Sequence, residues 1–514
     1  MTASGASGSE DNGVNERVVH RPLARNAVYN ALGLGLPVLV ALAAMPVLAR
    51  RLDPSTFGVL ALAWVVHAFA NELGFGRATT KFAAEHANEG GVGLARVVWS
   101  TCALQAVIGV VAGLGLLLAS SVLVEYVLRV PAALVGPATD AFRILALTVP
   151  VVVLGASVRG VLEAIQRFDL VNAVRGPATA ANFLLPVAAL TAGLGITGMV
   201  ALLLAARLAA LMTYAAIAWK LVPALRSPAV RGVELRRIVT FGGWTTVSGV
   251  VSPLLIYLDR FLLGALVSVA AVAYFAAPYE VVARLLIVPA SLVAALFPEF
   301  SALHGRGERA RVDALSARAV KVTLLATGPV AVLLVGSGPD LLRLWLGEAY
   351  ATAGALALQL LAVGMVINAV AHVPVAVLYG AGRPEIPARF HLIELPLHGA
   401  LAVVLIQAWG VAGAAAAWTT RVAIDAGLLL FATNRVAKGS MAALWRERVP
   451  QTAVLLAGCG LAAFGVAGVV HDFWMRGAAS ALLLTVLLSA LWRVGLQRAD
   501  RDRLVRLVVP ARAT

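Results

Sequence analysis

Charged residues are scarce in this chain of 514 residues. They make up 13% of it, against roughly 25% in a typical soluble domain. Hydrophobic residues make up 61%, and the mean hydropathy is +0.89. This composition excludes a soluble core and a disordered chain. The apolar residues form runs of about 20 separated by short basic loops, which is typical of a polytopic membrane protein.

Cysteine is almost absent. Cys102 and Cys459 both lie in apolar runs without neighbouring ligand residues, so they exclude a disulfide framework and a zinc site. The eight histidines are scattered, no Walker A sequence occurs, and the loops leave no room for a catalytic domain outside the membrane. We therefore expect a protein that is not an enzyme and that uses no cofactor or metal.

Fourteen apolar runs are long enough to cross a bilayer. An α-helix is the expected form of each run, because a backbone in lipid has to satisfy its own hydrogen bonds. The sequence thus predicts an all-α polytopic membrane protein with about 14 transmembrane helices. The predicted spans are 27–49, 57–76, 97–123, 138–158, 176–194, 196–219, 238–266, 270–298, 318–337, 352–379, 390–408, 411–433, 450–470 and 474–494.

The basic residues predict the orientation of these spans. Of the 41 lysines and arginines, 31 lie at one end of the predicted bundle, in the terminal segments and in alternate loops. Five lie at the other end, namely Arg50, Arg51, Arg129, Arg343 and Arg476. Basic residues accumulate on the cytosolic side of membrane proteins, so both termini are predicted to be cytosolic. This face meets anionic lipid, and the net charge of +15 therefore implies no nucleic-acid partner.

The remaining five basic residues lie within predicted spans, where each charge costs about 2.5–3.5 kcal/mol at the bilayer centre. Such charges have to be paired or to line a wet cavity. Two pairs have the i, i+4 spacing of neighbours on a helix face, Glu280 with Arg284 and Arg421 with Asp425. These pairs either neutralise each other between packed helices or face a central cavity. The arginines are Arg143, Arg207, Arg260, Arg284 and Arg421, and the acidic residues in or near spans are Glu72, Asp259, Glu280, Glu299, Glu394 and Asp425.

Two of these arginines call for separate interpretations. Arg207 has no acidic residue within a helical turn, and an unpaired arginine at this depth favours an anionic substrate. Arg260 follows Asp259 near the outer end of its span, where an arginine can extend its head group into the interface.

Several spans also contain proline, for example Pro289, and transporters that alternate between two states often use the resulting kinks. Each kink is equally compatible with a static bend.

Several stretches resemble one family in their order and spacing. They are RNAVYN (25–30), RRLDPSTFGVLALAW (50–64), NELGFGRATTKFAAE (71–85), GVLEAIQRFDLVNAVRGP (160–177), YLDRFLLGAL (257–266), AYFAAPYEVVARLLIVPASLVAALFPEFS (273–301) and LYGAGRPEIPARFHLIELPLH (378–398). From about residue 25 to residue 435 the chain resembles the polysaccharide transport (Wzx-type) oligosaccharide flippases, which are relatives of the MATE exporters and lipid II flippases in the MOP superfamily. Where the family pattern reads Asp-Leu-Gly, this chain has Glu72-Leu73-Gly74, which keeps the charge and changes its reach.

This resemblance implies two six-helix lobes around a central cavity. It implies translocation of an undecaprenyl-diphosphate-linked glycan to the outer leaflet by alternating access, with cationic side chains on the diphosphate. Arginine suits that role because its planar head group forms bidentate hydrogen bonds with phosphate. The candidate substrate-binding residues are Arg25, Arg51, Arg77, Arg207, Arg260, Arg284 and Arg421, and the candidate coupling carboxylates are Glu72, Asp259, Glu280 and Asp425.

The expected organisation has six parts. They are a disordered cytosolic tail (1–24), an N-terminal six-helix lobe (25–221), a basic cytosolic linker (222–237), a C-terminal six-helix lobe (238–435), helices 13 and 14 (436–494) and a basic cytosolic tail (495–514). The last two helices either pack peripherally, line a lipid groove or contact a partner.

Together these observations favour a flippase of lipid-linked oligosaccharides in the bacterial inner membrane. Its expected partners are the lipid-linked oligosaccharide, membrane lipid and other polysaccharide assembly proteins. A MATE-like exporter of amphipathic cations is the first alternative, although it requires an acidic cavity and the mid-span charges include as many arginines as carboxylates. An integral-membrane glycosyltransferase or polymerase is the second alternative, and the short loops disfavour it.

Overall fold

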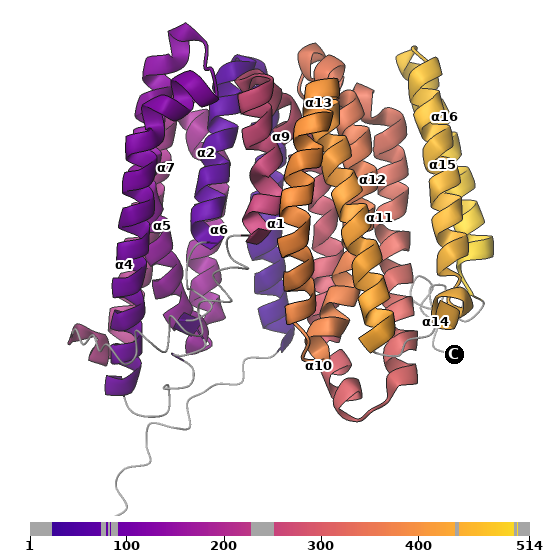
Figure 1. Ribbon diagram of the computed structural model, residues 1–514, viewed down its shortest axis with the longest axis horizontal. Coiled ribbons are helices and arrows are strands. Elements are labelled where there is room, and N and C mark those ends of the chain that lie inside the picture. The colour runs from indigo at the N-terminus through magenta and orange to yellow at the C-terminus, as the bar shows by residue number, and fades with distance from the viewer. Residues whose placement is uncertain are drawn as a thin grey trace, which may run out of the picture.

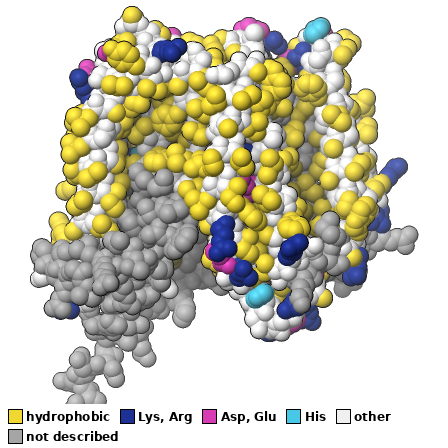
Figure 2. Space-filling view, in the orientation of Figure 1, with side chains coloured by type: hydrophobic (Ala, Val, Ile, Leu, Met, Phe, Trp, Pro, Cys, Tyr) yellow, Lys and Arg dark blue, Asp and Glu magenta, His cyan; other side chains and the backbone are white. Residues whose placement is uncertain are grey.

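All regular elements in the described part of the chain are helices. The computed structural model describes residues 23–72, 79–80, 83, 91–227, 251–436, 441–497 and 501. Ten of the helices in these ranges are long and apolar enough to cross a membrane. The predicted class, an all-α polytopic membrane protein, is thus confirmed. The helices stand side by side (Figure 1), and a broad band of hydrophobic side chains covers the face shown in Figure 2, with charged groups mostly at its two edges.

Two bundles of helices follow each other along the chain (Figure 1). We call the end of the molecule that carries residues 50–54 the outer end and the opposite end the inner end. The N-terminal bundle contains α1 (Leu23–Arg51), α2 (Pro54–Glu72), α4 (Gly91–Val122), α5 (Ala132–Ala164), α6 (Phe168–Thr191) and α7 (Gly195–Leu221), with short turns at Leu123–Val127 and Pro223–Arg226.

The C-terminal bundle begins in the described ranges with a helix at residues 251–266. It continues with α9 (Val269–Ala283), a 3₁₀ turn (Arg284–Leu286), α10 (Ile287–Gly305), α11 (Arg309–Trp345), α12 (Glu348–Gly380) and α13 (Glu385–Val436). A hairpin follows, made of α14 (Met441–Arg446), α15 (Val449–Val469) and α16 (Phe473–Ala490) with a last turn at Leu491–Gly495. The start of the predicted span 238–266 and most of the predicted linker 222–237 lie outside the described residues.

The long element α13 is a helical hairpin. Its backbone leaves the helical region at Gly410, where φ is 55° and ψ is −125°. Glycine adopts such a positive φ without steric cost. Glu394 before the turn faces Arg421 after it at 3.5 Å, so the two segments run antiparallel. The two predicted spans 390–408 and 411–433 therefore meet at the predicted position.

The predicted span 270–298 is interrupted in its middle. The α-helix α9 ends at Ala283, a 3₁₀ turn covers Arg284–Leu286, and α10 resumes at Ile287. Pro289 has no N–H to donate to the carbonyl four residues earlier, and its ring crowds that carbonyl. The break therefore places Arg284 at an irregular point of the helix, where its side chain projects differently from that of a straight helix.

The two bundles contact each other at the outer end. A side chain at Gly58 of α2 would lie 1.9 Å from the Val269 carbonyl oxygen of α9, so only glycine permits this approach. The Trp345 ring nitrogen donates a hydrogen bond to the Leu42 carbonyl at 3.0 Å, and Arg50 donates one to the Leu344 carbonyl. These contacts close the outer end between the bundles.

The C-terminal hairpin is fastened to α11 at both ends. Near the inner end the Lys321 ammonium, whose side chain is 2% exposed, lies 3.6 Å from a carboxylate oxygen of Glu447. Near the outer end Arg476 of α16 lies 2.7 Å from Asp340 of α11, and both side chains are buried. Of the three roles left open for helices 13 and 14, the structure shows packing on α11.

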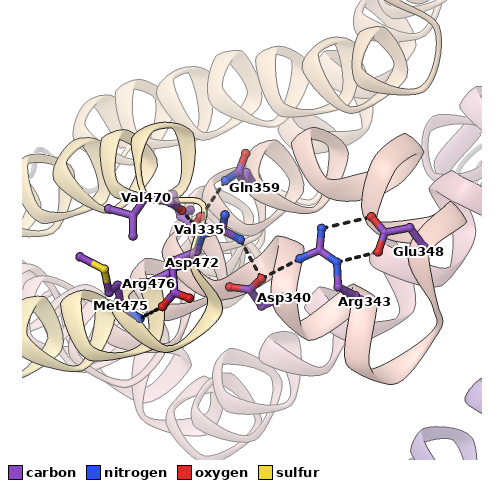
Figure 3. Close-up of polar contacts among 9 residues, drawn as sticks. All are labelled: Val335, Asp340, Arg343, Glu348, Gln359, Val470, Asp472, Met475 and Arg476. Atoms are coloured by element: carbon purple, nitrogen blue, oxygen red, sulfur yellow. Dashed lines mark hydrogen bonds and ion pairs between the residues drawn. The ribbon is translucent and has the colours of Figure 1, made fainter.

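The outer fastening is a branched network (Figure 3). Asp340 Oδ1 accepts hydrogen bonds from Arg476 and from Arg343, the latter at 2.9 Å, and Arg343 also contacts Glu348 at 2.6 Å. Arg476 donates a further hydrogen bond to the Val470 carbonyl at 2.7 Å. All four charges are thus paired, and for the buried Arg476 and Asp340 this pairing offsets their removal from water.

We expect Asp340→Asn to destabilise the folded protein by about 3–5 kcal/mol, because it leaves the Arg476 guanidinium buried without an opposite charge. The midpoint of thermal unfolding of the purified protein in detergent measures this loss. The double variant Asp340→Leu/Arg476→Met removes both charges and is expected to recover most of the stability.

The matched control is Asp140→Asn. It breaks the pair between Asp140 and Arg143, whose side chains are 56% and 55% exposed. An exposed pair contributes about 0–1 kcal/mol, so this variant is expected to unfold close to the wild-type temperature. Equal losses in Asp340→Asn and Asp140→Asn would contradict the fastening role of Asp340.

Candidate functional site

The predicted charges fall into separate places. Asp259, Arg260, Glu280, Arg284, Arg421 and Asp425 all lie in the C-terminal bundle, whereas Arg207 lies in the N-terminal bundle. Arg51 is exposed at the outer end of α1, and Glu72 is exposed at the end of α2. Arg77 and the side chain of Arg25 lie outside the described residues.

The pair Glu280 and Arg284 sits at the break in the span 270–298. The Arg284 guanidinium donates a hydrogen bond to Glu280 Oε2 at 2.8 Å, as the i, i+4 spacing predicts. The side chains of Arg284 and Glu280 are 31% and 29% exposed at a depth where the surrounding helices are apolar. Partly exposed charges at mid-membrane indicate a wet cavity, because lipid would leave them unsolvated.

Arg260 lies beside this pair and is buried. Its guanidinium carbon is 4.5 Å from the centre of the Tyr279 ring and 5.1 Å from that of the Tyr257 ring. The expectation that Arg260 extends into the outer interface is therefore wrong, since two aromatic faces hold it inside the bundle. The Tyr257 hydroxyl also interacts electrostatically with Glu280 and with Glu72, which belongs to the N-terminal bundle.

We name Tyr257, Arg260, Tyr279, Glu280 and Arg284 the cavity cluster. It offers two guanidinium groups, one carboxylate and two aromatic rings. The two positive charges fit an anionic group, whereas the two rings already pack against the Arg260 guanidinium. Of the predicted binding residues, the structure brings Arg260 and Arg284 together here, and Glu280 balances one of the two positive charges.

A second cluster lies deeper in the same bundle. Arg421 Nε is 3.5 Å from Glu394, and Arg421 Nη2 is 3.9 Å from Asp425. The Arg421 guanidinium also donates a hydrogen bond to the Leu255 carbonyl at 3.4 Å. His391 Nε2 lies 3.8 Å from Asp425 Oδ1. We name His391, Glu394, Arg421 and Asp425 the inner cluster.

A buried pair continues this line of polar groups. His398 Nε2 lies 3.3 Å from Asp259 Oδ1, and both side chains are completely buried. The second carboxylate oxygen of Asp259 and His398 Nδ1 have no hydrogen-bond partner. Asp259 comes directly before Arg260 in the helix 251–266, so the backbone of this helix joins the pair to the cavity cluster.

An aromatic contact lies between the cavity cluster and the inner cluster. The Tyr279 and Trp418 rings meet edge to face with centroids 5.8 Å apart. Tyr279 faces Arg260 on one side and lies within electrostatic reach of Arg421 on the other.

His391, Glu394 and His398 carry no role in the sequence-based prediction of the site. Their spacing is nevertheless a signal, because i, i+3 and i+7 lie on one face of a helix. Polar residues with helical spacing inside an apolar span mark a buried functional face. Their partners Asp259 and Arg421 belong to other segments of the chain, so only the folded structure identifies these pairs.

Arg207 occupies a different environment. It donates a hydrogen bond to Asn182 Oδ1, and the Asn182 carbonyl accepts one from the Trp64 ring nitrogen at 3.2 Å. His67 lies within electrostatic reach of Arg207. Within the described ranges Arg207 forms no ion pair with a carboxylate, in agreement with its sequence neighbourhood.

The inner cluster has the spacing of a metal site, yet it already contains a cation. Ligand atoms of His391, Glu394 and Asp425 lie within 4.8 Å of one another. The Arg421 guanidinium sits 3.5–3.9 Å from both carboxylates of that group. A metal ion placed there would meet a fixed positive charge at close range.

Comparisons with known proteins agree with this architecture. A family model described as polysaccharide biosynthesis protein matches residues 47–355, which is more than half of the chain. A Shigella flexneri protein assigned as an O-antigen transporter is 28% identical over 420 residues, which cover 80% of this chain and 98% of that protein.

Two solved structures share the fold. The lipid II flippase MurJ in an inward closed conformation superimposes with a TM-score of 0.70 at 13% identity, covering 91% of this chain and 99% of that one. An inward-facing multidrug resistance MATE transporter of the MOP superfamily gives a TM-score of 0.69 at 16% identity, covering 79% and 98%.

We expect water to reach the cavity cluster and not the Asp259–His398 pair. In a Cys102→Ala/Cys459→Ala background, Arg284→Cys should react with a charged, water-soluble thiol reagent, whereas His398→Cys should react far more slowly. Mass spectrometry of the labelled protein in membranes measures both rates. Equal rates would contradict the distinction between a wet and a dry cluster.

Proposed function

Because the chain belongs to the polysaccharide biosynthesis protein family and crosses the membrane many times, we propose that it is a flippase for lipid-linked oligosaccharides. Its substrate is a glycan attached to a polyprenyl diphosphate, which it moves from the cytosolic to the outer leaflet. The observation that carries this proposal is the partly exposed pair Glu280 and Arg284 close to the buried Arg260, within apolar membrane-spanning helices.

The chemistry of the substrate fits these residues. A polyprenyl diphosphate combines an anionic head, a polar glycan and a long apolar tail. Arg284 and Arg260 supply the positive charge for the diphosphate, and guanidinium groups bind phosphate through paired hydrogen bonds. Glu280 keeps Arg284 oriented while the cavity is empty. On substrate binding the diphosphate replaces Glu280 as the partner of Arg284.

The closed outer end supports transport by alternating access. Gly58 of α2 approaches the Val269 backbone of α9 closely, and this contact between the bundles at the outer end supports a conformation that is closed on that side. A lipid-linked glycan made in the cytosol enters from the inner end. Opening of the outer end and closure of the inner end then release it to the outer leaflet.

The cavity charges favour a flippase over a MATE-like exporter of amphipathic cations. Such a cationic substrate needs an excess of carboxylates around it, whereas the cavity cluster has two arginines and one glutamate. The similarity to the MATE fold concerns the architecture that both kinds of transporter share.

The proposal also covers how the chain divides into parts and where in the cell the protein lies. The chain divides into a tail (1–24), a lobe (25–221), a linker (222–237), a second lobe (238–435), the hairpin (436–494) and a tail (495–514). The protein lies in the bacterial inner membrane with both termini in the cytosol, and it works with other polysaccharide assembly proteins. The 31 basic residues predicted on the inner side support this orientation.

Arg284→Ala is expected to reduce surface-glycan export by about 10- to 100-fold, because a hydrogen bond to a charged group contributes about 1.5–3 kcal/mol. Arg207→Ala is expected to reduce export as well. The measurement is complementation of cells that lack the gene, with surface glycan quantified and polyprenyl-linked glycans identified by mass spectrometry. Loss of export should accompany accumulation of one diphosphate-linked oligosaccharide.

Arg143→Ala is the matched control, because Arg143 is an exposed arginine at the outer end. It should export normally, and all variants should be present in the membrane at wild-type amounts. Normal export by Arg284→Ala would overturn the assignment of the cavity. An unchanged lipid profile combined with altered sensitivity to cationic drugs would favour the exporter.

The orientation has its own test. A green fluorescent protein fused after Thr514 should fluoresce, because this reporter folds on the cytosolic side, and alkaline phosphatase inserted after Val470 between α15 and α16 should be active. An inactive phosphatase after Val470 together with a dark fusion at Thr514 would reverse the orientation.

A further inference from the structure

The C-terminal bundle buries more negative than positive charge when all groups carry their ordinary ionisation. The inner cluster combines two carboxylates, Glu394 and Asp425, with one guanidinium, Arg421, and their side chains are at most 10% exposed. Both Glu394 oxygens and Asp425 Oδ1 have no hydrogen-bond partner. A buried carboxylate without a donor or a counter-charge of its own is strongly destabilising. One positive charge is therefore missing from this cluster.

The Asp259–His398 pair has the same deficit. With a neutral imidazole, Asp259 is a completely buried carboxylate whose oxygens both lack a hydrogen bond. The neighbouring Arg260 does not compensate it, because its guanidinium faces the rings of Tyr257 and Tyr279. The short distance of 3.3 Å to His398 Nε2 gives an ion pair as soon as the imidazole carries a second proton.

A proton supplies the missing charge better than a metal ion does. Arg421 already lies 3.5 Å from Glu394 and 3.9 Å from Asp425, so a sodium ion between these carboxylates would be repelled at close range. Sodium, as a hard cation, also prefers oxygen ligands, whereas His391 and His398 offer nitrogen. A proton needs no coordination shell, and it converts one carboxylate oxygen into a hydrogen-bond donor.

The other titratable groups around these sites have partners of their own. On α9, Tyr279 faces Arg260, and Glu280 is paired with Arg284. On α12, His372 Nδ1 lies 2.8 Å from the Asn368 carbonyl. None of these contacts supplies a positive charge to Glu394, Asp425 or Asp259.

We propose that the C-terminal bundle binds a transported proton, and not a sodium ion, at Glu394–Asp425 and at Asp259–His398. One proton adds to a carboxylate oxygen of Glu394, whose two oxygens both lack a hydrogen-bond partner, forming a carboxylic acid, and another adds to the free ring nitrogen of His398, forming an imidazolium. The proton on Glu394 returns to water through His391, which at 25% exposure is the most accessible member. The coupling of this step to glycan movement rests on the proposed flippase function.

The connection to the cavity follows from the chain. Asp259 and Arg260 are consecutive residues, so a change in the Asp259–His398 contact turns the helix segment that holds Arg260. Tyr279 contacts Arg260 and packs on Trp418, which lies one helical turn from Arg421. Protonation in the bundle interior therefore changes the position of the cavity arginine that meets the diphosphate.

Infrared difference spectroscopy of the purified full-length protein in liposomes tests the proton sites without any glycan substrate. The acid-minus-alkaline spectrum should contain C=O bands of buried carboxylic acids. Glu394→Gln should remove one band, and Asp259→Asn should remove the imidazolium signal of His398. Asp140→Asn, which alters an exposed carboxylate, should leave these bands unchanged. Bands that persist in Glu394→Gln and Asp259→Asn would overturn the assignment.

Sodium provides a test that needs no variant. Replacing potassium by sodium at constant pH should leave the wild-type spectrum unchanged. A sodium-dependent shift of the carboxylate bands would overturn the proposal in favour of a sodium site. This comparison stays decisive if Glu394→Gln or Asp259→Asn fails to fold.

Coupling is tested by the distance between the two bundles. Spin labels at Leu194→Cys and Trp409→Cys, which are exposed at the outer ends of different bundles, report opening of the outer end in the Cys102→Ala/Cys459→Ala background. The distance distribution should change with pH, and Asp259→Asn should abolish the change. A pH-independent distribution would overturn the coupling. Because no glycan is present, this outcome leaves the flippase proposal intact, whereas normal export by Arg284→Ala bears on the flippase proposal alone.

Discussion

Each charged side chain inside the hydrocarbon layer needs an opposite charge, a hydrogen-bond partner or water, and most of the structure follows from this requirement. The face shown in Figure 2 carries a broad apolar band, and a charged side chain at that depth needs a partner or water. Arg476 with Asp340 is a buried pair, Lys321 with Glu447 is a pair with a buried ammonium, and both hold helices together. Glu280 with Arg284 is a pair of another kind, because it is partly exposed in the interior of the bundle.

This difference separates structural charge from functional charge. The Asp340–Arg476 network is saturated, since each charge has an opposite neighbour, and it fastens the C-terminal hairpin to α11 (Figure 3). The inner cluster and the Asp259–His398 pair are unsaturated, with oxygens that no donor reaches. Packing alone does not require such groups, whereas a site that gains and loses a proton does. The cavity cluster lies between these extremes, because its Glu280–Arg284 pair is formed but partly exposed.

The backbone contributes in the same way. Pro289 interrupts a span next to Arg284, Gly410 reverses the chain within α13, and Gly58 lets α2 approach the backbone of α9. Without these three residues, functional groups would stay apart or the two bundles would stay separate. The break at Arg284 also gives the C-terminal bundle an irregular point in a span that would otherwise be one continuous helix.

Much of this protein is determined by its sequence alone. The length and spacing of the apolar runs determine an all-α membrane fold, and the i, i+4 spacing determines the Glu280–Arg284 contact, because both depend on local geometry and on the low polarity of lipid. Tertiary structure decided that Arg260 turns inward onto Tyr279, that His398 meets Asp259 and that the last two helices pack on α11. These contacts join residues far apart in the chain, and which face of a uniformly apolar helix meets a neighbour depends on packing that no local pattern specifies.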